Sequence, residues 1–200
     1  MASVIKIMIT RGEGARGYAP SAISEPSRVL IQSPMPSYPA DIYRDGIALY
    51  TCQTRLAHQP LLAGIKHMNR LENVLARAEL KDPRFFDGLM LDYDHQVIEA
   101  VSGNLFIRKG DAVMTPSLTQ CGVAGVMRQK LLDWYYTHAR VVNVTALTLE
   151  DVLSADDVVV CNSIYGVLQV QQIDQHPLAS SGWAAALRSQ LKFVVYEAHI

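Results

Sequence analysis

The sequence has few cysteines and no excess of either charge. Its three cysteines, Cys52, Cys121 and Cys161, lie far apart and form no C-x-x-C pair. This pattern provides neither a disulfide framework nor the ligand spacing of a zinc site, and it predicts reduced thiols in a cytoplasmic protein. The 18 basic and 19 acidic residues leave a net charge of −1. Such a balance indicates no binding to nucleic acid and none to an anionic membrane surface.

Long hydrophobic runs are also missing. No segment approaches the ~18 apolar residues that a transmembrane helix needs, and the apolar start of the chain is too short for a signal peptide. The six histidines show no ligand spacing, and the sequence has no G-x-S-x-G nucleophile motif. We therefore expect no membrane span and no metal site.

Half of the 200 residues are hydrophobic and 18% are charged, which is the composition of a folded protein. Strand patterns are joined both by tight turns and by helical crossovers. This mixture predicts an α+β (mixed α/β) fold and not an open doubly wound sheet. We expect helices at 67–81, 125–138, 148–154 and 180–196, and strands at 3–10, 28–33, 46–52, 87–93, 96–101, 104–108, 112–115, 140–145, 157–161 and 167–170.

A glycine-rich loop follows the first predicted strand. Residues 12–17 match G-x-G-x-x-G, but proline and serine follow where a dinucleotide site needs a helix. Dinucleotide binding is therefore not predicted. The same loop carries Arg11 and Arg16, whose guanidinium groups suit a substrate carboxylate. A solvated loop explains these two arginines equally well.

Lys66 stands at the end of the apolar run 61–65, just before a predicted helix. A lysine in an apolar setting holds its proton weakly, as a Schiff-base lysine must. The commoner alternative is a lysine whose stem leads its ammonium group to water.

Glu99 lies inside the apolar strand pattern V-I-E-A-V. A buried carboxylate needs a strong partner, and a protonated ring nitrogen is one. An exposed position on an alternating strand is the other interpretation. Further along, the glycines of 122–125 precede a predicted helix, where free backbone N–H groups suit a phosphate, although an ordinary loop is more common. Ser163 follows another predicted strand and offers a hydroxyl.

These segments, taken in their order, resemble the fold-type IV pyridoxal-phosphate enzymes. The matching strings are G-I-K-H-M-N-R-L, V-I-E-A-V-S-G-N-L-F, T-P, G-V-A-G-V-M-R-Q and V-V-V-C-N-S. The string after Lys66 is similar to that of the aminodeoxychorismate lyases, whereas branched-chain and D-amino-acid aminotransferases usually differ there. The resemblance extends over about residues 5–170.

The resemblance implies a homodimeric lyase with pyridoxal 5′-phosphate as cofactor and a small-molecule substrate. The implied reaction converts 4-amino-4-deoxychorismate to 4-aminobenzoate and pyruvate, a step toward folate. The implied cofactor-binding residues are Lys66 (Schiff base), Glu99 (pyridine nitrogen), Val126 and Met127 (backbone N–H groups to the phosphate) and Ser163 (hydroxyl to the phosphate), with Asn104 in support.

The resemblance also implies a departure in domain organisation. Family members carry a small N-terminal subdomain that supplies an arginine to the phosphate and one wall of the substrate pocket, and we expect it to be absent here. We expect residues 1–54 to hold strands of the core sheet region with the 11–27 loop, and 55–200 to form the larger, barrel-like cofactor domain. An aminotransferase of the same fold, or a truncated member without catalysis, remain alternatives.

Overall fold

The computed structural model describes residues 3–20, 22–23 and 25–192. The chain divides into two units, 1–37 and 38–200, whereas the boundary predicted from the sequence lies after residue 54. The first unit is an antiparallel hairpin of β1 (Ser3–Ile9) and β2 (Arg28–Pro34). Because β1 is rich in β-branched residues, it favours the extended conformation. The described part of the loop between the two strands contains no helix.

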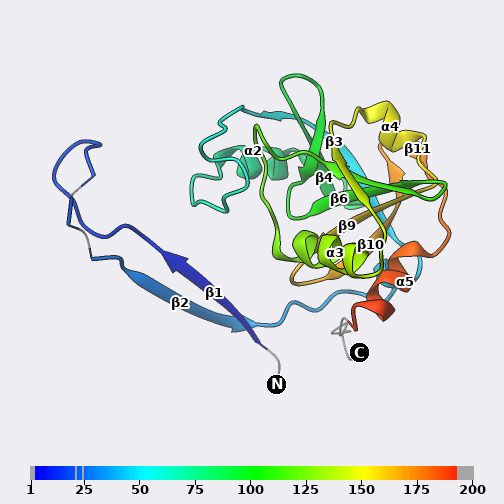
Figure 1. The fold of residues 1–200 in the computed structure, drawn as a ribbon, viewed down its shortest axis with the longest axis horizontal. Helices are drawn as coiled ribbons and strands as arrows, with labels where there is room; N and C mark the ends of the chain where they lie inside the picture. The colour runs from blue at the N-terminus through cyan, green and yellow to red at the C-terminus, as the bar shows by residue number, and fades with distance from the viewer. Residues whose placement is uncertain (1–2, 21, 24, 193–200) are drawn as a thin grey trace. The chain divides into compact units, whose positions relative to one another are not determined.

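The second unit is built on one sheet of nine described strands (Figure 1). The strands are β3 (Ile47–Leu56), β4 (Phe85–Asp92), β5 (Val97–Ala100), β6 (Asn104–Lys109), β7 (Ala112–Pro116), β8 (Val142–Thr145), β9 (Asp157–Asn162), β10 (Gly166–Ile173) and β11 (His176–Pro177). Their order is β5-β4-β3-β10-β9-β6-β7-β8, with β11 beside β10.

The sheet mixes parallel and antiparallel pairs and curls back on itself. Strand β3 is parallel to β4 and β10, and β7 is parallel to β8, while the other neighbours are antiparallel. The N–H of Val97 in β5 donates to the carbonyl of Leu147, just after β8, at 2.7 Å. The two ends of the strand order are thereby joined, and the predicted mixed α+β class with a barrel-like domain is confirmed.

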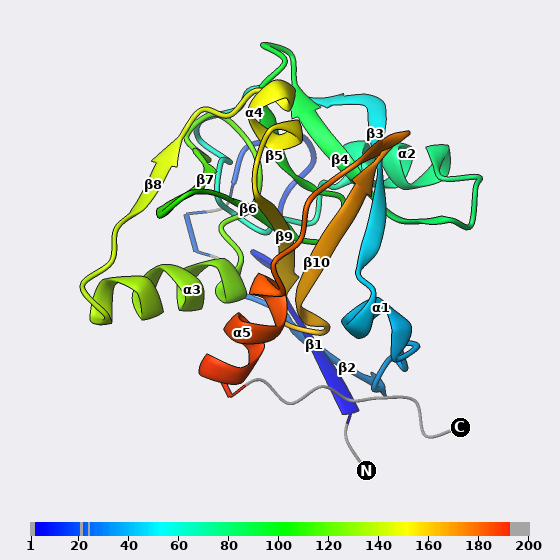
Figure 2. The same cartoon turned by 90° about the vertical axis from the view of Figure 1, so that its right-hand side faces the viewer.

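Helices cover part of this sheet. They are α1 (Asp41–Arg44), α2 (Leu71–Glu79), α3 (Val126–Thr137), α4 (Leu149–Leu153) and α5 (Trp183–Gln190). In Figure 2, α3 and α5 lie beside each other below β9 and β10. Strand β9 is buried on both faces because its side chains alternate: Val158 and Val160 join the core inside the curled sheet, whereas Val159 and Cys161 pack with α3 and α5.

Two helix predictions are corrected. The helix expected from residue 67 begins at Leu71, because the preceding loop is held by a β-bridge from Gly64 to Val123. Its apolar residues Leu71, Val74 and Leu75 are exposed, whereas Ala76 is buried. The closing helix ends at Gln190, and residues 193–196 of that prediction lie outside the described residues. The short α1 and β11 were not predicted.

The cysteines are free and buried, as the sequence predicts. Burial raises the pKa of each thiol to about 12. Among the described residues, no group of three or more histidine, cysteine or acidic side chains is placed to hold a metal ion. No helix in the described ranges combines the length and apolarity needed to cross a membrane.

Candidate active site

The segment Gly122–Gly125 is the centre of the candidate site. Glu99 Oε2, from β5, accepts the N–H of Val123 at 2.8 Å. Asn104, from the start of β6, donates its Nδ2 to the Val123 carbonyl at 2.7 Å and accepts the N–H of Gly125 on its Oδ1 at 3.1 Å. Two buried side chains, from strands that follow one another along the chain, therefore fix one short stretch of backbone.

Glycines are required in this stretch because the side chains beneath it leave no room. A Cβ on Gly122 would lie 2.7 Å from side-chain atoms of both Ile98 and Leu118, and the residue has a φ of +87°. A Cβ on Gly125 would lie 2.3 Å from Oδ1 of Asn104. The glycine pattern thus reflects close backbone packing at this point.

Glu99 is 3% exposed, so the interpretation that it lies on an exposed strand face is wrong. Burial raises its pKa from 4.5 to about 7, against the opposing effects of the Val123 N–H and of the positive charges of Arg70 and Lys66. Near neutral pH the carboxyl group is therefore about half protonated. A positively charged partner beside it would favour the ionised carboxylate.

The Lys66 loop is joined to the same segment. The N–H of Gly64 donates to the Gly122 carbonyl at 2.9 Å, and the N–H of Ala124 donates to the Gly64 carbonyl at 3.0 Å. The apolar setting, which was the less common of the two interpretations of Lys66, is not found, because Lys66 itself is exposed and Leu61, at the start of the preceding run, is 85% exposed. This pairing of Gly64 with residues 122 and 124 explains why α2 begins only at Leu71.

Arg70 was not among the residues predicted from the sequence, and it contacts the Lys66 loop. Its side chain donates to the carbonyl of Ile65 at 2.5 Å and to that of His67 at 3.3 Å, the two residues that flank Lys66. One guanidinium group therefore holds the lysine loop on both sides. A cavity of about 320 Å³ lies against this loop, lined in part by His67, Arg70 and Cys121. The spacing Lys66 to Arg70 carries no signal of this role.

The N-terminus of α3 follows Gly125 directly. Gly125 provides no side-chain cap, and the first N–H that bonds back to its carbonyl is that of Gln129, at 3.0 Å. The N–H groups of Val126 and Met127 therefore have no partner within the helix. Val126 is exposed and Met127 is buried, so one side of the helix N-terminus faces solvent. Backbone N–H groups at such an end favour the binding of an anion.

Ser163 lies in the turn after β9. In the register of β6 and β9, Asn104 is opposite Cys161, so the turn lies at the same end of the sheet as Asn104. Asn162 Oδ1 shapes the turn by accepting the N–H groups of Ile164 and Tyr165 at 2.8 and 2.9 Å. Ser163 itself is exposed and remains available to a ligand.

Arg11 and Arg16 are exposed residues of the first unit. The other predicted residues, Lys66, Glu99, Asn104, Val126, Met127 and Ser163, all belong to the second unit. The role of the two arginines toward a substrate stays a prediction.

The sequence matches the amino-transferase class IV family over residues 1–173. It is 44% identical over 169 residues to the aminodeoxychorismate lyase of Vibrio harveyi, and the matched region covers 84% of this chain and 62% of that protein. It is 24% identical over 174 residues to the D-alanine aminotransferase of Bacillus licheniformis, covering 87% of this chain and 60% of that protein. The chain therefore spans about three fifths of the length of these relatives.

The crystal structure of 4-amino-4-deoxychorismate lyase from Pseudomonas aeruginosa is similar in fold to most of this chain. It superposes with a TM-score of 0.90 at 43% sequence identity, and the match covers 94% of this chain and 70% of that one. The curled mixed sheet and the order of its site-bearing segments are thus shared with a solved structure. By its sequence and its fold, the chain belongs to the amino-transferase class IV family.

Proposed function

We propose that this chain binds pyridoxal 5′-phosphate and acts as a lyase that converts 4-amino-4-deoxychorismate to 4-aminobenzoate and pyruvate. The observation that carries the proposal is the arrangement around Gly122–Gly125. One backbone segment is bonded to Glu99, is joined to the Lys66 loop through Gly64, and leads into the uncapped start of α3. Enzymes of this family use pyridoxal phosphate, which needs these three features together.

The residues present fit the cofactor. A buried carboxyl whose pKa is about 7 suits a protonated ring nitrogen, because the ion pair offsets the burial of both charges. The N–H groups of Val126 and Met127 suit the phosphate, and Ser163 adds a hydroxyl donor. Lys66 Nζ suits the covalent bond to the aldehyde carbon.

The chain's own residues then have defined tasks in the reaction. When bound, pyridoxal phosphate supplies a ring that takes up the electron pair left by the departing proton. Lys66 Nζ, as a free amine, would accept the proton from the carbon that bears the nitrogen. It would then donate this proton to the oxygen of the leaving enolpyruvyl group, as the carbon–oxygen bond breaks and the same electron pair returns to the substrate ring. Glu99 keeps the ring nitrogen protonated, and loss of pyruvate leaves an aromatic ring.

The lyase assignment is favoured over an aminotransferase by two observations. The chain is 44% identical to an aminodeoxychorismate lyase but 24% identical to a D-alanine aminotransferase. The Lys66 loop also depends on Arg70, within the string K-H-M-N-R that resembles the lyases. An aminotransferase would convert the cofactor to pyridoxamine phosphate with D- or branched-chain amino acids, and we expect no efficient conversion.

We also propose that the protein forms a homodimer through the lysine loop and the outer face of α2. This apolar face combines loop and helix residues that are at least half exposed: Leu61, Ile65, Met68, Leu71, Val74 and Leu75. An apolar patch of this kind favours burial against a second copy. Analytical ultracentrifugation should give a dimer for the wild type and a monomer for Leu75→Glu, and a monomeric wild type would contradict the proposal.

The experiment that tests the enzyme proposal is borohydride reduction of the protein with pyridoxal phosphate, followed by peptide mapping and an assay of 4-aminobenzoate formation. We expect the pyridoxyl group on Lys66 and not on Lys130, an exposed lysine of α3. Labelling of Lys66 without product would leave the cofactor assignment standing and refute the lyase. Absence of label on Lys66 would refute both.

A further inference from the structure

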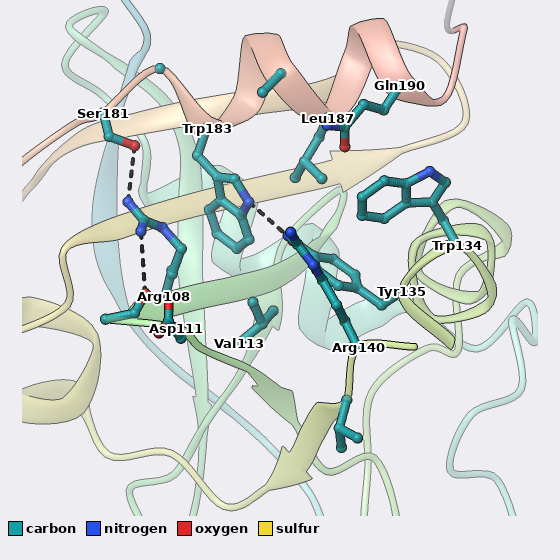
Figure 3. Close-up of a pocket in the computed structure, with 14 residues that line it drawn as sticks. Arg108, Asp111, Val113, Trp134, Tyr135, Arg140, Ser181, Trp183, Leu187 and Gln190 are labelled. Carbon is teal, nitrogen blue, oxygen red and sulfur yellow. Dashed lines mark hydrogen bonds between the residues drawn. The ribbon is translucent and has the colours of Figure 1, made fainter. Parts of the chain in front are cut away.

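A second pocket lies outside the candidate active site, between α3, α5 and the β6–β7 turn. It encloses about 610 Å³, within the usual range for small-molecule sites. Its apolar lining includes Trp134, Tyr135 and Trp183, and Figure 3 shows Trp183 reaching from α5 toward Tyr135 on α3. The indole Nε1 of Trp183 donates to the Tyr135 hydroxyl at 3.1 Å. These aromatic rings form a fixed floor.

Two arginines line the same pocket with different partners. Arg108 is engaged: its guanidinium pairs with the fully buried carboxylate of Asp157 and donates to Ser181 Oγ at 3.0 Å. Arg140 is exposed, and across the described ranges its side chain has no hydrogen bond or ion pair. In Figure 3, the Arg140 side chain extends toward Tyr135 and Trp183.

The backbone fixes the direction of Arg140. After α3, the N–H of Arg140 donates to the Tyr135 carbonyl at 2.9 Å and that of Ala139 donates to Tyr136 at 3.1 Å, which is the Schellman pattern of a helix end. Ala139 has a φ of +53°, a position that glycine fills more easily. The helix end thus fixes the backbone path that leads into Arg140.

The charge of Arg140 acts on the pocket floor. Burial raises the pKa of Tyr135, while the hydrogen bond from Trp183 and the positive charges of Arg140 and Arg108 oppose that rise. The guanidinium of Arg140 is thus close enough to the aromatic floor to influence its hydroxyl. A flat, apolar surface beside a guanidinium that has no partner among the described residues fits a ligand that is both planar and anionic.

We propose that this pocket binds a small aromatic carboxylate, with the carboxylate on the Arg140 guanidinium and the ring against Trp183 and Tyr135. The proposal does not rest on the proposed function, because none of these residues belongs to the candidate active site. The pairing of an arginine with aromatic walls favours such a ligand over a bare inorganic anion, which gains nothing from the rings.

The chain provides a direct reporter. It has two tryptophans, Trp134 and Trp183, and both line this pocket. Their two indole N–H signals in a proton–nitrogen correlation spectrum can be followed while benzoate is added. We expect saturable shifts with benzoate, and at least ~10-fold weaker binding of acetate, which lacks the ring, and of benzamide, which lacks the charge. Unchanged indole signals, or equal binding of acetate, would overturn the proposal.

Arg140→Ala identifies the residue responsible. We expect at least ~10-fold weaker benzoate binding in Arg140→Ala, and wild-type binding in Arg84→Ala, which removes an exposed arginine that does not line this pocket. Because Arg140 is exposed, the variant should keep its melting temperature, and its two indole signals should still be resolved as in the folded wild type. Wild-type benzoate affinity in a folded Arg140→Ala variant would refute the assignment.

Discussion

The candidate active site has a buried half and an exposed half. The buried half is Glu99 and Asn104, whose side chains bond to the backbone of residues 123 and 125 over 2.7 to 3.1 Å. The exposed half is Lys66, Val126 and Ser163. Buried polar groups must find partners for the chain to fold, so folding itself selects the geometry of the first half. The exposed groups carry no such requirement and remain available to a ligand.

The difference between the two halves predicts which property each substitution changes. Substitutions in the buried half should change the free energy of unfolding, because they leave buried groups without partners. Substitutions in the exposed half should change cofactor binding or activity and leave stability nearly unchanged. Four variants test this division, from the largest expected effect to the smallest.

Lys66→Ala should lower lyase activity by a factor of at least ~10³, because it removes both the covalent link and the proton carrier. Its free energy of unfolding should stay within about 0.5 kcal/mol of the wild type, since Lys66 is exposed. Activity assays and urea unfolding measure the two effects. Lys130→Ala is the matched control, and a large loss of stability in Lys66→Ala would break the division between the halves.

Glu99→Gln should remove a pH dependence of stability. The unfolded chain releases the Glu99 proton near pH 4.5, whereas the folded chain keeps it until about pH 7. The folded state therefore binds more protons in this window, and the free energy of unfolding falls as the pH rises through it. Relative to Glu99→Gln, the wild type should lose about 3 kcal/mol between these pH values.

Urea unfolding at pH 4.5 to 7 measures the Glu99 effect. Added pyridoxal phosphate should reduce the slope for the wild type, because a protonated ring nitrogen stabilises the carboxylate. Parallel pH profiles of the wild type and Glu99→Gln without cofactor would show that Glu99 keeps an ordinary pKa, and would contradict its place in the buried half.

Asn104→Ala should lower the free energy of unfolding by about 2 kcal/mol, since the Val123 carbonyl and the Gly125 N–H lose a buried partner. It should also weaken pyridoxal phosphate binding, because the start of α3 is no longer held. Thermal unfolding and a cofactor titration measure these effects. Asn143→Ala removes an exposed asparagine of β8, and it should be neutral in both measurements.

Ser163→Ala should have the smallest effect. Loss of one exposed hydroxyl should weaken pyridoxal phosphate binding by less than about 10-fold, with no change in melting temperature. Ser180→Ala, also an exposed serine, is the control for the binding measurement. Destabilisation of Ser163→Ala by more than about 1 kcal/mol would show that this turn belongs with the buried half.

Local patterns in the sequence predict much of the fold. The V-V-V-C stretch predicts a strand, and the structure gives β9 with alternating side chains in two cores. The start of α2 was not predicted, because helical spacing from Met68 gives no sign that Gly64 bonds to residues 122 and 124. The start of α2 depends on backbone pairing between segments that are distant in the sequence. The periodicity of residues within one segment gives no information about such pairing.

The candidate site was predicted unevenly for the same reason. A carboxylate in an apolar strand left two interpretations of Glu99 open, and only its contact with Val123, 24 residues away, settles its burial. Arg70 acts through backbone carbonyls, which every residue has, so its role leaves no pattern. The aromatic pocket combines three distant stretches, around 108–113, 134–141 and 181–190, and no single stretch resembles a site.

The central claim is that the two halves together hold pyridoxal phosphate through Lys66. The visible absorbance spectrum during titration of the protein with pyridoxal phosphate tests it most directly. We predict a saturable band, distinct from that of free pyridoxal phosphate, which is present in the wild type and absent in Lys66→Ala. A spectrum that remains the sum of free pyridoxal phosphate and protein throughout the titration would contradict the claim.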